Sequence, residues 1–248
     1  MSIVRHIHAD LLGAATSRTL RVAVPCIVAF AALVTAGLVT TYGTENEVAD
    51  LATAWGQGEV LVDPLSGLLV AAVLATFWGA AHRDGAILWS FLAGAGRWRV
   101  AVSALVVALL VALVTGVLAA AAKIGTLTAL APSDVPLVWS SHPHGTWAVG
   151  GGIFAVATFS LTATCLAFLL RHGAATLGVL FTWVLLVEPL VAGLLPREGR
   201  PWLPGHALIA VRDHVPDVST VAALATSLGY TAALVAVTLV VVARRDPA

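Results

Sequence analysis

The amino-acid sequence predicts an all-α, polytopic membrane protein with six transmembrane helices. Of the 248 residues, 59% are hydrophobic and only 10% are charged, whereas an ordinary soluble domain carries about 25% charged residues. The mean hydropathy is +0.96. Six apolar runs are each close in length to the about 20 residues that a helix needs to cross a bilayer. No stretch between these runs is long enough for a separate globular unit. We therefore expect residues 1–248 to form one transmembrane domain.

The apolar runs define a six-span region over residues 22–243, with predicted spans at 22–42, 64–81, 100–122, 146–170, 174–195 and 221–243. The N-terminus of the second predicted span has the clearest sequence signal, because Asp63 can cap free N–H groups and Pro64 fits a first helical turn. The first run follows Arg5, Arg18 and Arg21, an order of charges also found in signal peptides. Its apolar core is too long for one and further spans follow, so we interpret it as a retained helix, with a signal peptide as the alternative.

Residues 1–21 are predicted to be an element of their own ahead of the first span. Ile3, Ile7, Leu11 and Ala14 recur in them at helical spacing, with polar residues between. This pattern fits an amphipathic interfacial helix on the inner membrane face. A frayed cytosolic tail is the alternative, because termini are often loose.

The charges between the spans predict the orientation in the membrane. With both termini cytoplasmic, the inner segments hold nine arginines and three aspartates, whereas the outer segments hold four cations and nine acidic residues. The inner arginines are Arg5, Arg18, Arg21, Arg83, Arg97, Arg99, Arg171, Arg244 and Arg245. Because cytoplasmic loops carry the excess of Lys and Arg, both termini are predicted to be cytoplasmic.

The inner segment 82–99 joins the second and third predicted spans and has a short apolar stretch between two charged ends. Arg83 and Asp84 stand at its start and Arg97 and Arg99 at its end, and the apolar stripe between them consists of Ile87, Leu88, Phe91 and Leu92. A short helix with this stripe would lie at the inner surface as a docking element. The alternative is a loop whose cations only anchor it among the lipid headgroups.

Two short motifs give the chain a resemblance to a known family. The first is Arg83-Asp84-Gly85-Ala86-Ile87 with residues 94–99 behind it, and the second is residues 183–190 followed by residues 200–204. Together with the pattern of spans, they make the chain similar to the permease subunits of bacterial ABC transporters of the ABC-2 (exporter) type, particularly short actinobacterial members. The chain departs from that pattern at Ala86, where the family has threonine, at 94–96, where proline is usual, and in lacking a lysine early in the third span.

The resemblance implies a function and a set of partners. It implies a permease in the bacterial cell membrane that works with a second permease copy and exports a hydrophobic or amphipathic cargo such as a drug, a peptide antibiotic, a lipid or a glycan. ATP and Mg²⁺ would be bound by a separate cytoplasmic ABC ATPase subunit, and residues 83–96 would be the coupling helix that sits in its groove. The implied coupling residues are Arg83, Asp84, Gly85, Ile87, Leu88, Phe91 and Arg97.

Several kinds of chemistry are not expected in this chain. The only lysine, Lys123, is followed by Ile124, so no phosphate-binding Walker loop is present and we expect no ATPase activity of its own. The net charge is zero, so the basic surface that nucleic acids require is missing. His142 and His144 form a close pair without further ligands nearby, and we expect no metal site or other cofactor.

Glu188 is the one acidic residue inside a predicted span. An acidic side chain at the centre of a membrane helix costs about 2.5–3.5 kcal/mol on insertion scales, so we expect Glu188 to face protein or water. It is either a proton or cation site, a polar residue of the transport path, or a structural carboxylate beside Pro189. Trp183 is a candidate substrate contact, with interfacial anchoring as the alternative. The alternative functions are accordingly a proton-coupled secondary transporter that uses Glu188 and a membrane scaffold or intramembrane enzyme without transport.

The outer segment between the fifth and sixth spans is also unusual. Residues 196–219 contain four prolines around the apolar stretch 207–211. Such a segment is predicted to dip back toward the membrane, which requires that neighbouring protein shield its backbone.

Overall fold

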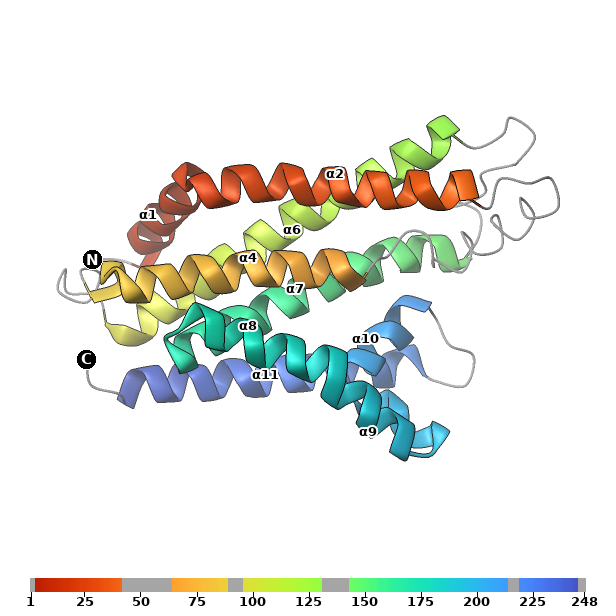
Figure 1. Ribbon diagram of the computed structural model, residues 1–248. Coiled ribbons are helices and arrows are strands. Elements are labelled where there is room, and N and C mark those ends of the chain that lie inside the picture. Colours follow the sequence, from red (N-terminus) through yellow and green to blue (C-terminus); the bar gives the residue numbers. More distant parts are fainter. Residues whose placement is uncertain (1–2, 42–63, 89–95, 131–142, 214–218, 245–248) are drawn as a thin grey trace.

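The computed structural model describes residues 3–41, 64–88, 96–130, 143–213 and 219–244, and these ranges contain helices but no strand (Figure 1). The first half of the chain forms α1 (Ile3–Thr16), α2 (Arg18–Thr41), α4 (Pro64–Arg83), α6 (Arg97–Leu130) and α7 (Pro143–Leu170). The second half forms α8 (Gly173–Thr182), the π-helical turn η1 (Trp183–Val187), α9 (Glu188–Leu194), the 3-10 helix η2 (Arg197–Trp202), α10 (Pro204–Asp213) and α11 (Thr220–Arg244).

Within the described ranges, five helices are long and apolar enough to cross a membrane, which indicates a membrane protein. They are Arg18–Gly37, Arg97–Leu130, Val149–Leu170, Gly173–Leu194 and Thr220–Arg244, and they coincide with predicted spans one, three, four, five and six. The predicted second span forms α4, which has 20 residues and carries His82 and Arg83 in its last turn. The helix α4 is not among the five.

The helix α6 is longer than the predicted third span. It has 34 residues and continues past residue 122 to Leu130, because no proline interrupts residues 123–130 and a lysine does not stop a helix. Lys123 is only 2% exposed. The sequence had assigned this lysine to an outer loop, whereas it lies inside α6 with its side chain covered by the protein.

The bundle is organised around α6 and α7. In the most apolar segment of each candidate span, 56% of the residues are buried in α6 and 61% in α7, against 17–22% in α2, in the fifth span and in α11. The helix α7 contacts α4, α6, α8, α10 and α11. Small side chains line these contacts, and the fully covered ones include Ala71, Ala75, Ala104, Ala108, Ala112, Ala163 and Ala167. Small residues let membrane helices approach closely, and the three outer helices keep apolar faces for lipid or another protein.

The helix α1 is a separate element that packs on α6. Ser17 divides it from α2, and the two helices meet at an angle (Figure 1). The hydroxyl of Ser103 donates a hydrogen bond of 2.5 Å to Oδ2 of Asp10, and His6 and Ala14 are buried. Residues 3–16 are thus helical and attached to the bundle, which excludes a frayed tail over this range.

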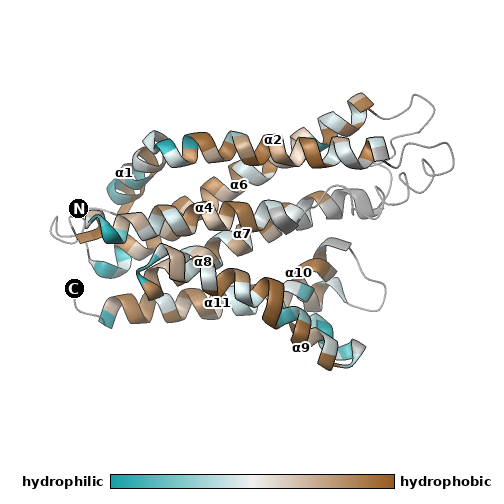
Figure 2. Ribbon diagram, viewed as in Figure 1, coloured by the Kyte–Doolittle hydropathy of each residue, from teal (hydrophilic) through white to brown (hydrophobic). Residues whose placement is uncertain are grey.

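Polar side chains concentrate at the ends of the bundle (Figure 2). The start of α1, the end of α4, the start of α6, the α7–α8 junction and the end of α11 all lie at the same end (Figure 1). We call it the basic end, because it includes Arg83, Arg97, Arg171 and Arg244. The charge pattern in the sequence had predicted that these four arginines share one side.

Candidate functional site

The turn after α4 lies at the basic end, where the sequence predicts the coupling helix. The amide of Asp84 donates to the carbonyl of Ala80 (2.8 Å), and that of Gly85 donates to the carbonyl of His82 (3.3 Å). Gly85 has a φ of +71°, a left-handed conformation that glycine adopts readily and that commonly ends a helix. The chain then begins a new helical turn at residues 86–88. We call residues 83–88 the coupling turn.

The coupling turn presents some of the predicted coupling residues and covers others. Arg83 Nε and Asp84 Oδ1 form an ion pair of 3.2 Å, with side chains 79% and 63% exposed. Leu88 is 42% exposed. Ile87 is only 7% exposed and belongs to the main hydrophobic core. Its side chain is therefore not available to a partner, and it anchors the turn to the bundle instead.

The remaining predicted coupling residues lie farther along the chain. Arg97 is the first residue of α6 and is partly buried. Next to it, Trp98 is 48% exposed and the Arg99 guanidinium lies 5.5 Å from the centroid of its ring. Phe91 and Leu92 lie outside the described residues.

The last turns of α4 cross the start of α8 at two glycines. A Cβ atom placed on Gly79 would lie 2.4 Å from the Cα of Gly173, and one placed on Gly173 would lie 3.3 Å from the carbonyl oxygen of Ala75. No side chain separates the two backbones, so any larger residue would force these helices apart. Gly79 stands four residues before Arg83, the first residue of the coupling turn, so the turn follows closely on the contact with the start of the fifth span.

The junction that leads into α8 is equally tight. Arg171 has a φ of +54°, which lets α7 and α8 follow each other with only two residues between them. His172 caps α8, because its Nδ1 accepts a hydrogen bond from the amide of Ala175 (3.2 Å). The aromatic side chains of Trp78 and Phe168, 5.6 Å apart between centroids, join α4 to α7 beside this junction.

The fifth span contains a π-helical turn immediately before Glu188. The amide of Glu188 donates to the carbonyl of Trp183, five residues earlier. Pro189 follows, and a proline ring inside an α-helix clashes with the carbonyl four residues before it. The wider turn relieves this clash, and π-helical turns are frequent at functional sites.

The structure places the Glu188 carboxylate at the N-terminus of α10. Glu188 is 4% exposed, and its Oε1 accepts a hydrogen bond of 2.8 Å from the backbone amide of His206. The Nδ1 of His206 lies 3.3 Å from the same oxygen. A Cβ atom on Gly205 would lie 2.7 Å from Oε1, so the glycine lets the carboxylate reach the free amides of the first helical turn. This geometry supports the interpretation of Glu188 as a buried structural carboxylate.

The helix α10 lies against α7 and α11. Four of its side chains are nearly covered, namely Ala207, Leu208, Ala210 and Val211. The apolar stretch 207–211 thus belongs to a helix packed on the bundle, and protein covers four of its five side chains. That this stretch dips back toward the membrane stays a prediction.

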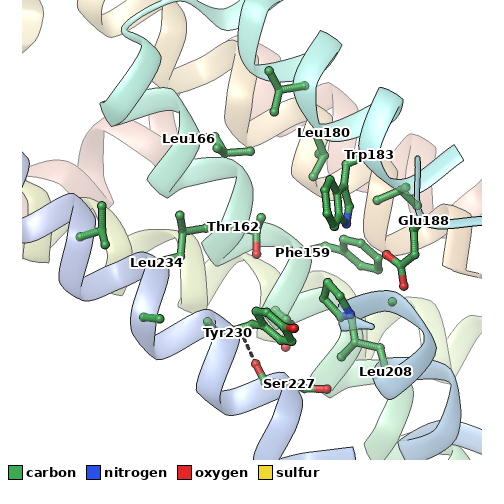
Figure 3. A pocket seen from close by; sticks show the side chains of 18 residues that line it. Phe159, Thr162, Leu166, Leu180, Trp183, Glu188, Leu208, Ser227, Tyr230 and Leu234 are labelled. Atoms are coloured by element: carbon green, nitrogen blue, oxygen red, sulfur yellow. Dashed lines mark hydrogen bonds between the residues drawn. The ribbon is translucent and has the colours of Figure 1, made fainter. Parts of the chain in front are cut away.

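A cavity of about 490 Å³ lies next to Glu188, between α7, the fifth span, α10 and α11 (Figure 3). Phe159, Trp183 and Tyr230 line it together with Glu188, and most of the remaining lining is aliphatic. Ser227 also lines the cavity. It is 1% exposed, and among the described residues its hydroxyl has no hydrogen-bond partner. A buried hydroxyl without a partner is costly.

The sequence predicted two of these cavity residues, Glu188 and Trp183, and missed the others. Those on α11 share one face, because Ser227, Tyr230, Thr231 and Leu234 follow at helical spacing. Three polar residues on one face of an otherwise apolar span were a usable signal. The contributions of α7 and α10 had no such signal, because the packing of the helices brings them there.

Metal ligands do not gather in the described part of the chain, where no group of three or more His, Cys, Asp or Glu side chains is found. His142 lies outside the described residues, and the side chain of His144 is not described either. The expected absence of a metal site at this pair therefore stays a prediction.

Neither a model of a known protein family nor any curated protein matches this chain.

Proposed function

We propose that this chain is the membrane-spanning permease subunit of an ATP-driven exporter of the ABC-2 type. In this proposal α4 also crosses the membrane, which brings the number of spans to six. The helix α1 lies at the inner membrane surface, and the basic end faces the cytoplasm of a bacterial cell. The chain works with a second permease copy and a cytoplasmic ABC ATPase subunit. It moves a hydrophobic or amphipathic molecule.

The observation that carries the proposal is the connection between the coupling turn and the cavity. The coupling turn follows α4 directly, and α4 meets α8 at Gly79 and Gly173 without intervening side chains. The helix α8 continues into the π-helical turn that carries Trp183 to the cavity. A force on the exposed side chains of the turn would therefore reach the cavity through close backbone contacts, since packed elements transmit displacement.

The partners in the proposal follow from two features of the chain, the missing Walker lysine and an exposed apolar face. The sequence has no Walker lysine, so ATP and Mg²⁺ are assigned to the ATPase subunit. The fifth span exposes Leu185, Leu186, Leu190 and Leu194 to between 57% and 87%. Such a face requires membrane lipids or the second permease copy as its cover.

The first test is purification of the chain with its cellular partners from mild detergent, followed by an assay of ATPase activity. We expect a P-loop ATPase to co-purify and its activity to respond to the permease. Arg83→Asp and Leu88→Asp should reduce this response at least about tenfold, because a tenfold change requires only about 1.4 kcal/mol of lost interaction. Arg244→Asp is the matched control, since it inverts another exposed cation at the basic end.

A substitution at Ile87 is unsuitable for this test. Ile87 is buried, so a charge there would disturb the bundle itself. If no ATPase co-purifies, or if the Arg83 and Leu88 variants behave like the Arg244 control, the coupling role fails.

The contact between His206 and Glu188 favours a second candidate function, a proton-coupled secondary transporter. These two titratable groups lie 3.3 Å apart, and Glu188 lines the cavity. Such pairs occur in proton relays of transporters. Transport in sealed vesicles separates the two candidates. An ATP-driven exporter stops when ATP is removed, whereas a proton-coupled transporter stops when a protonophore collapses the gradient.

A further inference from the structure

The cavity beside Glu188 has the size and the chemical asymmetry of a ligand site. Its volume of about 490 Å³ lies within the range of about 300–1,000 Å³ that is typical of small-molecule sites. Polar groups are confined to a few positions, and the rest of the wall is aliphatic or aromatic. Ligand sites commonly combine an apolar wall with a few placed polar groups in this way.

The charge in the cavity has one sign. Among the described residues that line it, Glu188 is the only Asp, Glu, Lys or Arg. Its Oε1 accepts from His206, which approaches from α10, while no hydrogen bond to Oε2 is found within the described chain. A carboxylate in an apolar surrounding favours a cation, because the low local dielectric strengthens their attraction.

Aromatic side chains stand around the same carboxylate. Figure 3 shows the rings of Trp183, Phe159 and Tyr230 gathered on the Glu188 side of the cavity, while Leu166 and Leu234 lie on the opposite side. A hydrogen bond holds the Tyr230 ring in place, because the Tyr230 hydroxyl donates to the backbone carbonyl oxygen of Trp202 (3.1 Å). Aromatic faces attract organic cations, and clusters of them recognise quaternary ammonium groups.

We propose that this cavity binds a lipophilic organic cation. Its ammonium group lies among the three aromatic rings next to Glu188, and its apolar chain extends along the wall toward Leu166 and Leu234. The identification of this ligand class as the exported cargo rests on the proposed function, whereas the binding itself does not.

The experiment measures equilibrium binding of radiolabelled dodecyltrimethylammonium to the full chain in phosphatidylcholine nanodiscs, with empty nanodiscs as background. We expect saturable binding above background. Unlabelled dodecanol, which has the same chain without the charge, should compete at least about tenfold more weakly, and dodecyl sulfate should not compete.

Two variants test the cavity itself. Glu188→Gln should weaken binding at least about tenfold, because it removes the charge while an amide oxygen can still accept from His206. Leu234→Trp should abolish binding by filling the cavity. Leu228→Trp is its matched control, because Leu228 is on the same helix, is 53% exposed and does not line the cavity. If Glu188→Gln lowers the unfolding temperature, the binding measured for Leu234→Trp and Leu228→Trp becomes the test of the cavity.

The inference is overturned if binding does not exceed that of empty nanodiscs, if dodecanol competes as well as the cation, or if Leu234→Trp binds like Leu228→Trp. Neither ATP nor a partner is present in this measurement. Saturable binding without a co-purifying ATPase would thus uphold the site and remove its role in ATP-driven export. A coupled ATPase without cation binding would uphold the exporter and remove this ligand.

Discussion

The two ends of the fifth span are attached to the bundle in opposite ways. At the basic end, α8 meets α4 through the bare backbones of Gly79 and Gly173. At the other end, α9 meets α10 through the buried carboxylate of Glu188 and the amide of His206. The first junction depends on shape and the second on a polar contact.

This difference indicates how each junction responds to change. A contact between backbones tolerates no added atom, so the two helices move as one body or separate. A carboxylate contact can be altered by a bound ligand while the helices stay in place, since its energy depends on nearby charges. The rigid junction adjoins the coupling turn, and the adjustable one adjoins the cavity, an order that suits a force applied at the turn and read at the cavity.

The largest effect is expected from Gly79→Leu. The added Cβ would lie 2.4 Å from the Cα of Gly173, and no flexible side chain is there to move aside. The loss of folding free energy should reach or exceed the about 1–3 kcal/mol of ordinary overpacking. Thermal unfolding in detergent measures it, and Gly178→Leu is the control, because nothing lies within 4 Å of a Cβ at Gly178. Equal unfolding temperatures for the two variants would show that the α4–α8 crossing is not a tight junction.

A smaller loss is expected from Glu188→Ala. This change leaves the amide of His206 without its acceptor in a buried place, which costs about 1–3 kcal/mol. Glu188→Gln keeps an acceptor and should retain most of the stability. The same unfolding assay compares the two variants. If alanine and glutamine destabilise the protein equally, Glu188 does not stabilise the fold by accepting the hydrogen bond from the His206 amide.

The smallest effect is expected at Asp10, where α1 is attached to α6. Burial raises the pKa of this carboxyl above 3.8, its unfolded value, although the Ser103 hydrogen bond and the positive field of His6 act in the opposite direction. The folded state thus retains the proton to higher pH than the unfolded state. The stability that this proton contributes is complete below pH 3.8 and is lost as the pH rises through the folded pKa.

Asp10→Asn should remove this pH dependence. In the wild type, the attachment of α1 to α6 should weaken as the pH rises from about 4 toward neutrality. The loss of free energy should be less than about 1 kcal/mol, because Asp10 is partly exposed. Hydrogen exchange of the α1 amides, compared between wild type and variant at each pH, measures the change. The exposed Asp84→Asn serves as control. If the difference in α1 amide exchange between the wild type and Asp10→Asn does not grow with pH, the assignment to Asp10 is wrong.

The sequence was most informative where a local pattern specifies a local structure. Apolar runs of membrane-spanning length predicted the five long helices, because backbone hydrogen bonds in lipid must be satisfied within the segment. Arginine placement predicted that Arg83, Arg97, Arg171 and Arg244 share one end. The end of α6 was predicted eight residues too early, because the apolar run was ended before Lys123, whereas the fold buries this lysine inside the helix.

The tertiary structure alone decided how the parts meet. Ile87 and Leu88 are neighbours of equal hydrophobicity, and only packing puts the first into the core and leaves the second exposed. The partner of Glu188 comes from eighteen residues farther along the chain, and the cavity is formed by four elements that no short motif connects. Hydrophobic length and charge are properties of a segment and can be read along the chain. A cavity, a glycine crossing or a buried carboxylate contact depends on distances between segments, which exist only once the helices have packed.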